Sequence, residues 1–449
     1  MVQNVTEVKY LIIGNSAGGI AAAEAIREVD KTGALAIISD EPYPAYSRPL
    51  IAEYLTEKCP LERMLFRPLD FYERNNIHTF LGRKAARLKL NEHIIELDSR
   101  DKIWWQKLLL ATGGLPIVPR VEGIERKGVF TFTTLDDAKA IDQYLNRFLN
   151  RKVRAVVIGG GLIGVSVTEA LIKRRVEVTV VEMKERILNV MLDEETSALE
   201  EELLGRAGVR LITGRTVAEI SSYSGGAVTG VTLDDGTPIP CELVIVAIGV
   251  QPRIELVTDT GIKVNRGIVV DRYMTTSNPD IYACGDVAEA YDISYGECRL
   301  TPIWPNAYLG GRIAGFNMAG RPTEYPGGTA MNSLKYFGLD VVSAGMVNPP
   351  DDSYEVLSQS HDDTYRKVIL KDGLVVGLVF AGNIEKSGIV FNLIKNQINA
   401  DDFKQVLIAE DFSLTSLPED LWRPQLELPP SALVSPVETE PVEELVVGE

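Results

Sequence analysis

Two glycine-rich turns in this sequence have the spacing that binds the diphosphate of a dinucleotide. Glycine allows a tight turn after a strand and lets backbone N–H groups at the start of the next helix approach phosphate oxygens. An acid about 20 residues further on would accept hydrogen bonds from a ribose. The first turn contains Gly14, Ser16, Ala17 and Gly19, and the second contains Gly159, Gly161, Leu162, Ile163 and Gly164. The acids that follow are Asp40 or Glu41 and, in the second case, Glu182.

Each glycine of the first turn has its own expected task. Gly14 would form the tight turn, and Gly19 would let the helix pack closely on the strand. Ser16 stands where such turns usually have a second glycine, so a small side chain must fit beside the phosphates. Asp40 and Glu41 suit the ribose equally well, and the sequence leaves both open.

Glu182 predicts which nicotinamide nucleotide binds at the second turn. A carboxylate there would bond a ribose 2′-hydroxyl and repel a 2′-phosphate, which favours NADH over NADPH. Arg186 is close by in the sequence and works against this preference. The alternative interpretation is that Glu182 is a solvated residue at the end of a strand.

The elements around the two turns repeat in the same order of strand, turn, helix, strand and acid. Apolar strands are expected at 8–13 and 35–38 in the first unit, and at 153–158 and 177–181 in the second. Buried-strand runs then end at Thr112 and Gly113 in one region and at Gly249 in the other, where a backbone can approach a cofactor. The pattern predicts an α/β protein with two Rossmann-like domains. Alternating strands from about 325 to 422 predict a separate α+β domain.

Composition excludes several classes of protein. With 449 residues, of which 45% are hydrophobic and 24% charged, the chain can bury a large core. A net charge of −17 argues against nucleic-acid binding. No apolar run reaches the roughly 20 residues that span a membrane. The cysteines are Cys59, Cys241, Cys284 and Cys298. Their spacing fits neither a metal site nor a redox disulfide, so we predict no bound metal and a cytoplasmic location.

A third segment, 275–286, completes a resemblance to the FAD-dependent pyridine nucleotide-disulfide oxidoreductase superfamily over roughly residues 8–420. The resemblance implies that Asp286, preceded by Gly285, holds the ribityl chain of FAD, and that Thr112 and Gly113 form a second FAD contact. Segment 43–50 is similar to the rubredoxin, ferredoxin and nitrite reductase branches, which implies cofactor contacts for Arg48 and Pro49.

The resemblance also implies the domain order. An FAD domain would be split around an inserted NAD domain and followed by an interface domain that often forms homodimers. The expected boundaries are 1–118 for the first part of the FAD domain, 119–250 for the NAD domain, 251–323 for the second FAD part and 324–424 for the interface domain. Residues 425–449 are rich in Pro, Glu, Val and Ser and are expected to be a disordered acidic tail.

Thiol chemistry, which gives the superfamily its name, is not expected here. Where disulfide reductases of this family place reactive cysteines, the chain has Tyr46, Ser47 and Arg48, and Cys59 lies too far along. In the C-terminal region, His361 is the only histidine. We therefore assign no catalytic side chain, and a disulfide reductase that uses Cys59 is the less favoured alternative.

Two further departures concern the region where the flavin and nicotinamide would meet. Leu162 and Ser166 replace a tyrosine and a glutamate common in relatives. Glu53 aligns with the flavin-side lysine of the ferredoxin-reductase branch. A carboxylate there would disfavour the anionic reduced flavin by charge repulsion, unless Glu53 turns outward to solvent.

The leading hypothesis is a hydride transfer from NADH to FAD, after which electrons leave to a separate acceptor. That acceptor would be a small electron-carrier protein such as a rubredoxin or ferredoxin, a partner iron–sulfur subunit, or oxygen. The alternative is an FAD-bearing electron-transfer or scaffold subunit of a larger complex, in which Leu162 and Ser166 mark a weakened nicotinamide site.

Overall fold

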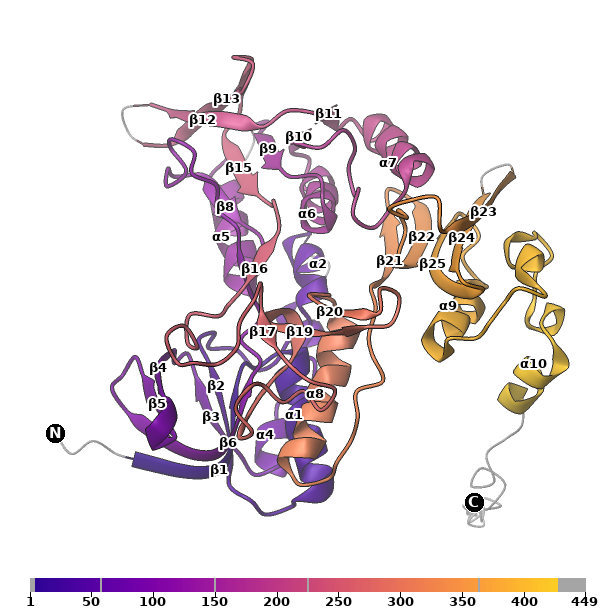
Figure 1. Cartoon of the computed structure of the whole chain (residues 1–449). Coiled ribbons are helices and arrows are strands. Elements are labelled where there is room, and N and C mark those ends of the chain that lie inside the picture. The colour runs from indigo at the N-terminus through magenta and orange to yellow at the C-terminus, as the bar shows by residue number, and fades with distance from the viewer. Residues whose placement is uncertain (1–4, 57–58, 149–150, 224–225, 362–363, 427–449) are drawn as a thin grey trace, which may run out of the picture.

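The computed structural model describes residues 5–56, 59–148, 151–223, 226–361 and 364–426 (Figure 1). The chain forms a first domain, a second domain above it in this view, and a C-terminal domain beside both. The predicted acidic tail lies outside the described residues from 427 onward, and 425–426 close helix α10 (Glu419–Leu426).

The first domain is built on a seven-stranded sheet with the order β3-β2-β1-β6-β5-β4. Strand β18 comes from far along the chain and pairs in parallel with β6, which confirms the predicted split domain. Helix α1 (Ala17–Val29) connects β1 to the parallel β2 and packs on α8 (Trp304–Met318). The strands are β1 (Val5–Ile13), β2 (Leu35–Ser39), β3 (Ile77–Leu81), β4 (Ala85–Lys89), β5 (Ile94–Leu97), β6 (Lys102–Leu110) and β18 (Ile281–Ala283).

The second domain repeats the plan with a five-stranded parallel sheet in the order β11-β10-β9-β15-β8. Its strands are β8 (Val129–Thr131), β9 (Arg154–Ile158), β10 (Glu177–Val181), β11 (Arg210–Ile212) and β15 (Leu243–Val246). Its helices are α5 (Leu135–Leu145), α6 (Leu162–Lys173) and α7 (Glu194–Arg206), and β12 (Val217–Ser222), β13 (Val228–Leu233) and β14 (Pro238–Pro240) form a small antiparallel sheet. The two predicted βαβ units are therefore present at the predicted places.

Two short sheets complete this part of the fold. Strands β7 (Gly114–Pro116) and β16 (Val250–Pro252) pair where the chain crosses between the domains. A second short sheet contains β17 (Ile268–Val269), β19 (Ala288–Asp292) and β20 (Glu297–Arg299).

The C-terminal domain is an antiparallel sheet in the order β21-β22-β25-β24-β23, packed against helix α9 (Ser387–Asn396). Its strands are β21 (Met331–Tyr336), β22 (Leu339–Gly345), β23 (Glu355–His361), β24 (Thr364–Lys371) and β25 (Leu374–Ala381). The buried Asp193 at the start of α7 accepts hydrogen bonds from the Tyr365 hydroxyl at 2.7 Å and from Lys367 Nζ at 3.1 Å. These polar contacts fasten the sheet to the second domain.

The segment that follows β2 packs differently from what its place in the chain suggests. It includes α2 (Ile51–Leu55) and α3 (Leu61–Met64). The buried side chains of Tyr46, Leu55 and Met64 belong to the hydrophobic core of the second domain, with α5 and α6. This segment is thus a structural bridge between the two nucleotide-type domains.

Candidate functional site

A cavity of about 1480 Å³ lies between the first and second domains and reaches strands β21 and β22 of the C-terminal domain. Pockets for one drug-sized ligand usually have about 300–1,000 Å³, so this cavity has room for a larger or a second ligand. It is lined by nearly all the residues singled out from the sequence: Gly14, Ser16, Ala17, Asp40, Glu41, Arg48, Pro49, Thr112, Gly113, Gly159, Gly161, Leu162, Ile163, Glu182, Gly249, Gly285 and Asp286.

Two predicted residues, Gly19 and Gly164, are not part of the lining. A β-carbon on Gly19 would lie 1.9 Å from the carbonyl oxygen of Gly14, and one on Gly164 would lie 1.9 Å from that of Gly159. Real β-carbons do not approach an oxygen this closely, so both glycines allow the helix to meet the turn before it. For Gly19 this is the helix–strand packing that the sequence predicts, and Gly164 has the corresponding place in the second unit.

The turns that they support suit a diphosphate. Helix α1 begins after Ser16 and helix α6 after Gly161, and neither N-terminus receives a side-chain cap. The N–H groups of a first helical turn have no partner within the helix, and here the helix starts line the cavity. A β-carbon on Gly161 would meet no atom within 4 Å, so the backbone is open to a ligand at this point. Both helix starts therefore fit phosphate groups.

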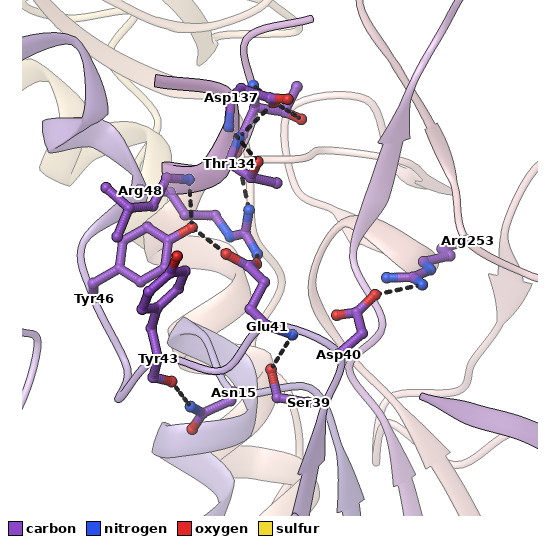
Figure 2. A network of polar contacts seen from close by, with 12 residues as sticks. Asn15, Ser39, Asp40, Glu41, Tyr43, Tyr46, Arg48, Thr134, Asp137 and Arg253 are labelled. Atoms are coloured by element: carbon purple, nitrogen blue, oxygen red, sulfur yellow. Dashed lines mark hydrogen bonds and ion pairs between the residues drawn. The ribbon is translucent and has the colours of Figure 1, made fainter. Parts of the chain in front are cut away.

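The two candidate acids of the first domain differ in their partners (Figure 2). Asp40 pairs with Arg253, with 2.6 Å between Oδ2 and Nη2. The Glu41 carboxylate accepts hydrogen bonds from the Tyr46 hydroxyl, at 2.5 Å, and from the Arg48 guanidinium. Glu41 is the more enclosed acid, with a side chain 15% exposed against 41% for Asp40. Both acids line the cavity, so both remain candidates for the ribose. Asp40 is held by one ion pair, and Glu41 is held by two hydrogen-bond donors.

Glu182 lies at the matching place in the second domain. Its carboxylate accepts a hydrogen bond from the backbone N–H of Gly160 at 2.6 Å and one from that of Lys184 at 2.8 Å. The Arg186 side chain turns away and donates to Asn348 Oδ1 at 3.1 Å, so the opposing charge expected from the sequence is absent from the cavity lining of the described residues. Lys184, by contrast, is exposed at the lining.

Asp286 lies deep in the cavity wall, in the short 3₁₀ helix η4 (Gly285–Val287). Burial raises the pKa of its carboxyl, and the positive charge of Arg48 opposes this shift. A carboxyl at a wall that also contains a guanidinium is suited to bond the hydroxyl groups of a polyol chain.

The region expected to hold the nicotinamide end differs partly from expectation. Glu53 is exposed and does not belong to the lining among the described residues, so the outward orientation is correct and the repulsion argument does not apply. Leu162 and Ser166 do line the cavity. Ser166 hydrogen-bonds with Tyr336 of strand β21, and burial raises the pKa of that phenol to about 12.

Sequence reasoning missed Arg253, Tyr336 and Lys184. Arg253 follows strand β16, its backbone N–H donates to the Gly113 carbonyl at 3.0 Å, and its carbonyl accepts from the Thr112 hydroxyl at 2.8 Å. Arg253 could not be predicted as a partner of Asp40, because the two residues are far apart along the chain. Lys184 was detectable, because it is two residues beyond Glu182.

The cysteines are free thiols, and Cys284 is the one that lines the cavity. Burial raises the pKa of this thiol to about 12, which disfavours the reactive thiolate. Cys59 is buried in the core of the second domain. In the described part of the chain, no group of three or more His, Cys, Asp or Glu residues is arranged to hold a metal, and no helix is long and apolar enough to cross a membrane.

Two Rossmann-like domains that face one cavity, followed by an antiparallel C-terminal domain, define a class of dinucleotide-dependent oxidoreductase. Residues 8–311 match the family model described as pyridine nucleotide-disulphide oxidoreductase, and residues 331–398 match the rubredoxin NAD+ reductase C-terminal domain. The chain belongs to the pyridine nucleotide-disulphide oxidoreductase family, which implies FAD and NAD(H) as cofactors.

Similar proteins include subunit epsilon of NADH-dependent phenylglyoxylate dehydrogenase from Aromatoleum evansii, 29% identical over 93% of this chain and 99% of the relative. NADH-rubredoxin oxidoreductase from Clostridium acetobutylicum is 29% identical over 84% of this chain and 91% of the relative. The crystal structure of a ferredoxin reductase from Rhodopseudomonas palustris has a TM-score of 0.81 and 25% identity, and the match covers 91% of this chain and 98% of that one. The protein is therefore an oxidoreductase enzyme of the flavoprotein type.

Proposed function

We propose that this protein takes a hydride from NADH onto FAD and passes electrons to a separate carrier protein. The observation that carries the proposal is that both glycine turns and the acids at the ends of β2 and β10 line one cavity. FAD would lie along Gly14, Ser16, Ala17, Thr112, Gly113, Arg48, Pro49, Gly285 and Asp286, with Asp40 or Glu41 at its ribose. The nicotinamide nucleotide would lie along Gly159, Gly161, Leu162, Ile163, Gly249 and Glu182.

The bound flavin supplies the redox chemistry, and the side chains bind and orient the two cofactors. We propose no catalytic side chain and no redox-active cysteine. The raised pKa of Cys284 and the position of Cys59 within a hydrophobic core support this part of the proposal. If Cys59→Ser abolished turnover with every acceptor, the disulfide-reductase alternative would replace it.

We propose NADH as the preferred donor. Glu182 faces the cavity and Arg186 is engaged elsewhere, which supports this preference, whereas the exposed Lys184 opposes it. Four free thiols are typical of a reducing compartment, which supports a cytoplasmic location.

A rubredoxin or ferredoxin is the proposed acceptor. The match to a rubredoxin NAD+ reductase C-terminal domain and the names of two similar proteins support it. The test is to reduce the FAD-loaded protein with NADH without oxygen and then add oxidised rubredoxin, ferredoxin or air separately. Rapid reduction of one carrier supports the proposal. Peroxide formation in air, with no carrier reduced at any rate, would make oxygen the acceptor and overturn it.

A second candidate function is an FAD-bearing subunit of a larger complex. The similarity to subunit epsilon of a dehydrogenase over 99% of that relative favours it specifically. Purification of the native protein tests it: a second polypeptide that stays bound at stoichiometric amounts supports the subunit function, and a free homodimer or monomer contradicts it.

A further inference from the structure

Tyr46 forms hydrogen bonds in two domains at once (Figure 2). Its hydroxyl donates to Glu41 Oε2 at 2.5 Å and accepts from the backbone N–H of Leu135 at 3.0 Å. Leu135 is the first residue of helix α5, so this N–H has no partner within its helix. Tyr46 is 5% exposed and packs in the core of the second domain. The side chain therefore has one fixed position.

The end of α5 that receives this hydroxyl is well ordered by its own residues. Thr134 and Asp137 form a reciprocal capping box, in which Thr134 Oγ1 accepts from Asp137 N–H at 3.1 Å and Asp137 Oδ2 accepts from Thr134 N–H at 3.0 Å. Capping boxes of this kind fix the entry of the chain into a helix. Tyr46 thus binds to a rigid point of the second domain.

The other partner of Glu41 is anchored at the same place. Arg48 donates to Glu41 and also, through Nη1, to the carbonyl oxygen of Thr133 at 2.9 Å. Both groups that hold Glu41 are therefore attached to the two residues on either side of the Thr134 cap. Asp40 is held differently: its partner Arg253 is tied to Gly113 and Thr112, not to the start of α5.

We infer that Tyr46 is a positioning residue that fixes Glu41 as the ribose-binding acid of the FAD site, using the N-terminus of α5 as its anchor. The inference deepens the proposed function and rests on FAD binding along the first turn. Because the anchor belongs to the second domain, FAD bound by Glu41 and an ordered start of α5 stabilise each other, and such coupling is reciprocal.

Tyr46→Phe tests the inference, because it keeps the buried ring and removes only the hydroxyl. The dissociation constant of FAD is measured by flavin fluorescence on the full chain. A hydrogen bond to a charged group corresponds to about tenfold in affinity, so we expect Tyr46→Phe to bind FAD about tenfold more weakly. Tyr54→Phe is the matched control on the same segment: its hydroxyl makes no hydrogen bond with the described residues, and FAD affinity is expected within twofold of wild type.

A second measurement separates positioning from general loosening. Glu41→Gln keeps the Tyr46–Leu135 bond but removes the carboxylate, and Tyr46→Phe is expected to weaken FAD by less than threefold in that background. Tyr43→Phe cuts a different contact with α5, the one with Asp136 and Lys139, and leaves Glu41 untouched. Hydrogen exchange at the Leu135 amide is expected to slow when FAD binds wild type and to respond less in Tyr46→Phe.

Three results would overturn the inference: FAD affinity unchanged in Tyr46→Phe, an equal loss in Tyr43→Phe, or the same tenfold loss with and without the Glu41 carboxylate. A wild-type protein that binds no FAD would instead refute the proposed function itself, so the two failures are distinguishable.

Discussion

Arg253 Nη2 lies 2.6 Å from Asp40 Oδ2, which joins the segment that leaves the second domain to the end of strand β2 in the first. The backbone of Arg253 is bonded on both sides as well, to Gly113 and to Thr112. These contacts of Arg253 hold the segment that returns from the second domain to the first beside the cavity. We call the Arg253–Asp40 ion pair the latch.

Opening this latch should speed the loss of FAD. We expect Arg253→Ala to release FAD about fivefold faster and to lower the free energy of unfolding by less than about 1 kcal/mol, because the pair is partly exposed. Release is followed by flavin fluorescence after dilution. Arg206→Ala, which breaks an exposed ion pair with Glu202 on α7, is the control. Equal release rates in the two variants would contradict the latch.

Glycines at the turns should separate into structural and ligand-facing positions. Gly14 has a φ of +124°, and its β-carbon would lie 2.1 Å from the carbonyl oxygen of Ala111. Gly14→Ala is therefore expected to unfold the first domain or to abolish its FAD binding. Gly161→Ala has no such conflict, so its melting temperature should stay within 2 °C of wild type while NADH binds at least roughly tenfold more weakly. A Gly161→Ala variant that binds NADH normally would exclude this turn as the diphosphate site.

Charge at the end of β10 should set the choice of nucleotide. Glu182→Gln removes the repulsion of a 2′-phosphate, so the ratio of NADH to NADPH affinity is expected to fall about tenfold. Lys184→Ala is expected to raise the same ratio, since it removes a cation from the lining. Titration of both nucleotides against each variant measures this. Unchanged ratios in both variants would assign the selectivity elsewhere.

Stability should depend on pH through Glu200, a fully buried residue of α7. Neither carboxyl oxygen has a hydrogen-bond partner among the described residues, and burial together with the charge of Glu169 raises the pKa to about 7. A raised carboxyl pKa favours the protonated folded state, so the contribution of Glu200 to stability is most favourable at low pH. It falls as the pH rises from about 4.3, the ordinary glutamate pKa, to about 7.

Glu200→Gln should remove this dependence. The variant is expected to be more stable than wild type at pH 8 by up to about 4 kcal/mol, and no more stable at pH 4.5. Thermal unfolding at both values, with FAD at saturation, measures the difference. Glu202→Gln, an exposed acid on the same helix, is the control. A Glu200→Gln variant whose gain in stability over wild type is the same at pH 4.5 and pH 8 would contradict the assignment.

The sequence predicted the repeated units because their information is local. Strand β9, the turn at Gly159 and strand β10 lie within one short stretch of the chain, and the structure has them where the sequence predicts. The same reasoning placed nearly every candidate at the cavity. Glycine spacing and hydrophobic periodicity act within one unit, so one chain suffices to detect them.

Contacts between residues far apart in the chain could not be predicted from local sequence patterns. The packing of Tyr46 and Leu55 in the core of the second domain depends on the relative placement of two domains. The sequence left the orientation of Glu53 open, because an alignment carries no information about which side of α2 is covered. Arg186 was expected at the nucleotide because of its sequence distance, but Asn348 of the C-terminal domain draws it away.

The central claim is tested most directly by an anaerobic titration of the FAD-loaded protein with NADH, followed by flavin absorbance. The account predicts complete bleaching at one NADH per FAD, fast with NADH and much slower with NADPH. A flavin that stays oxidised with excess NADH would contradict it, and the cavity at Leu162 and Ser166 would then belong to a subunit that receives its electrons from another protein.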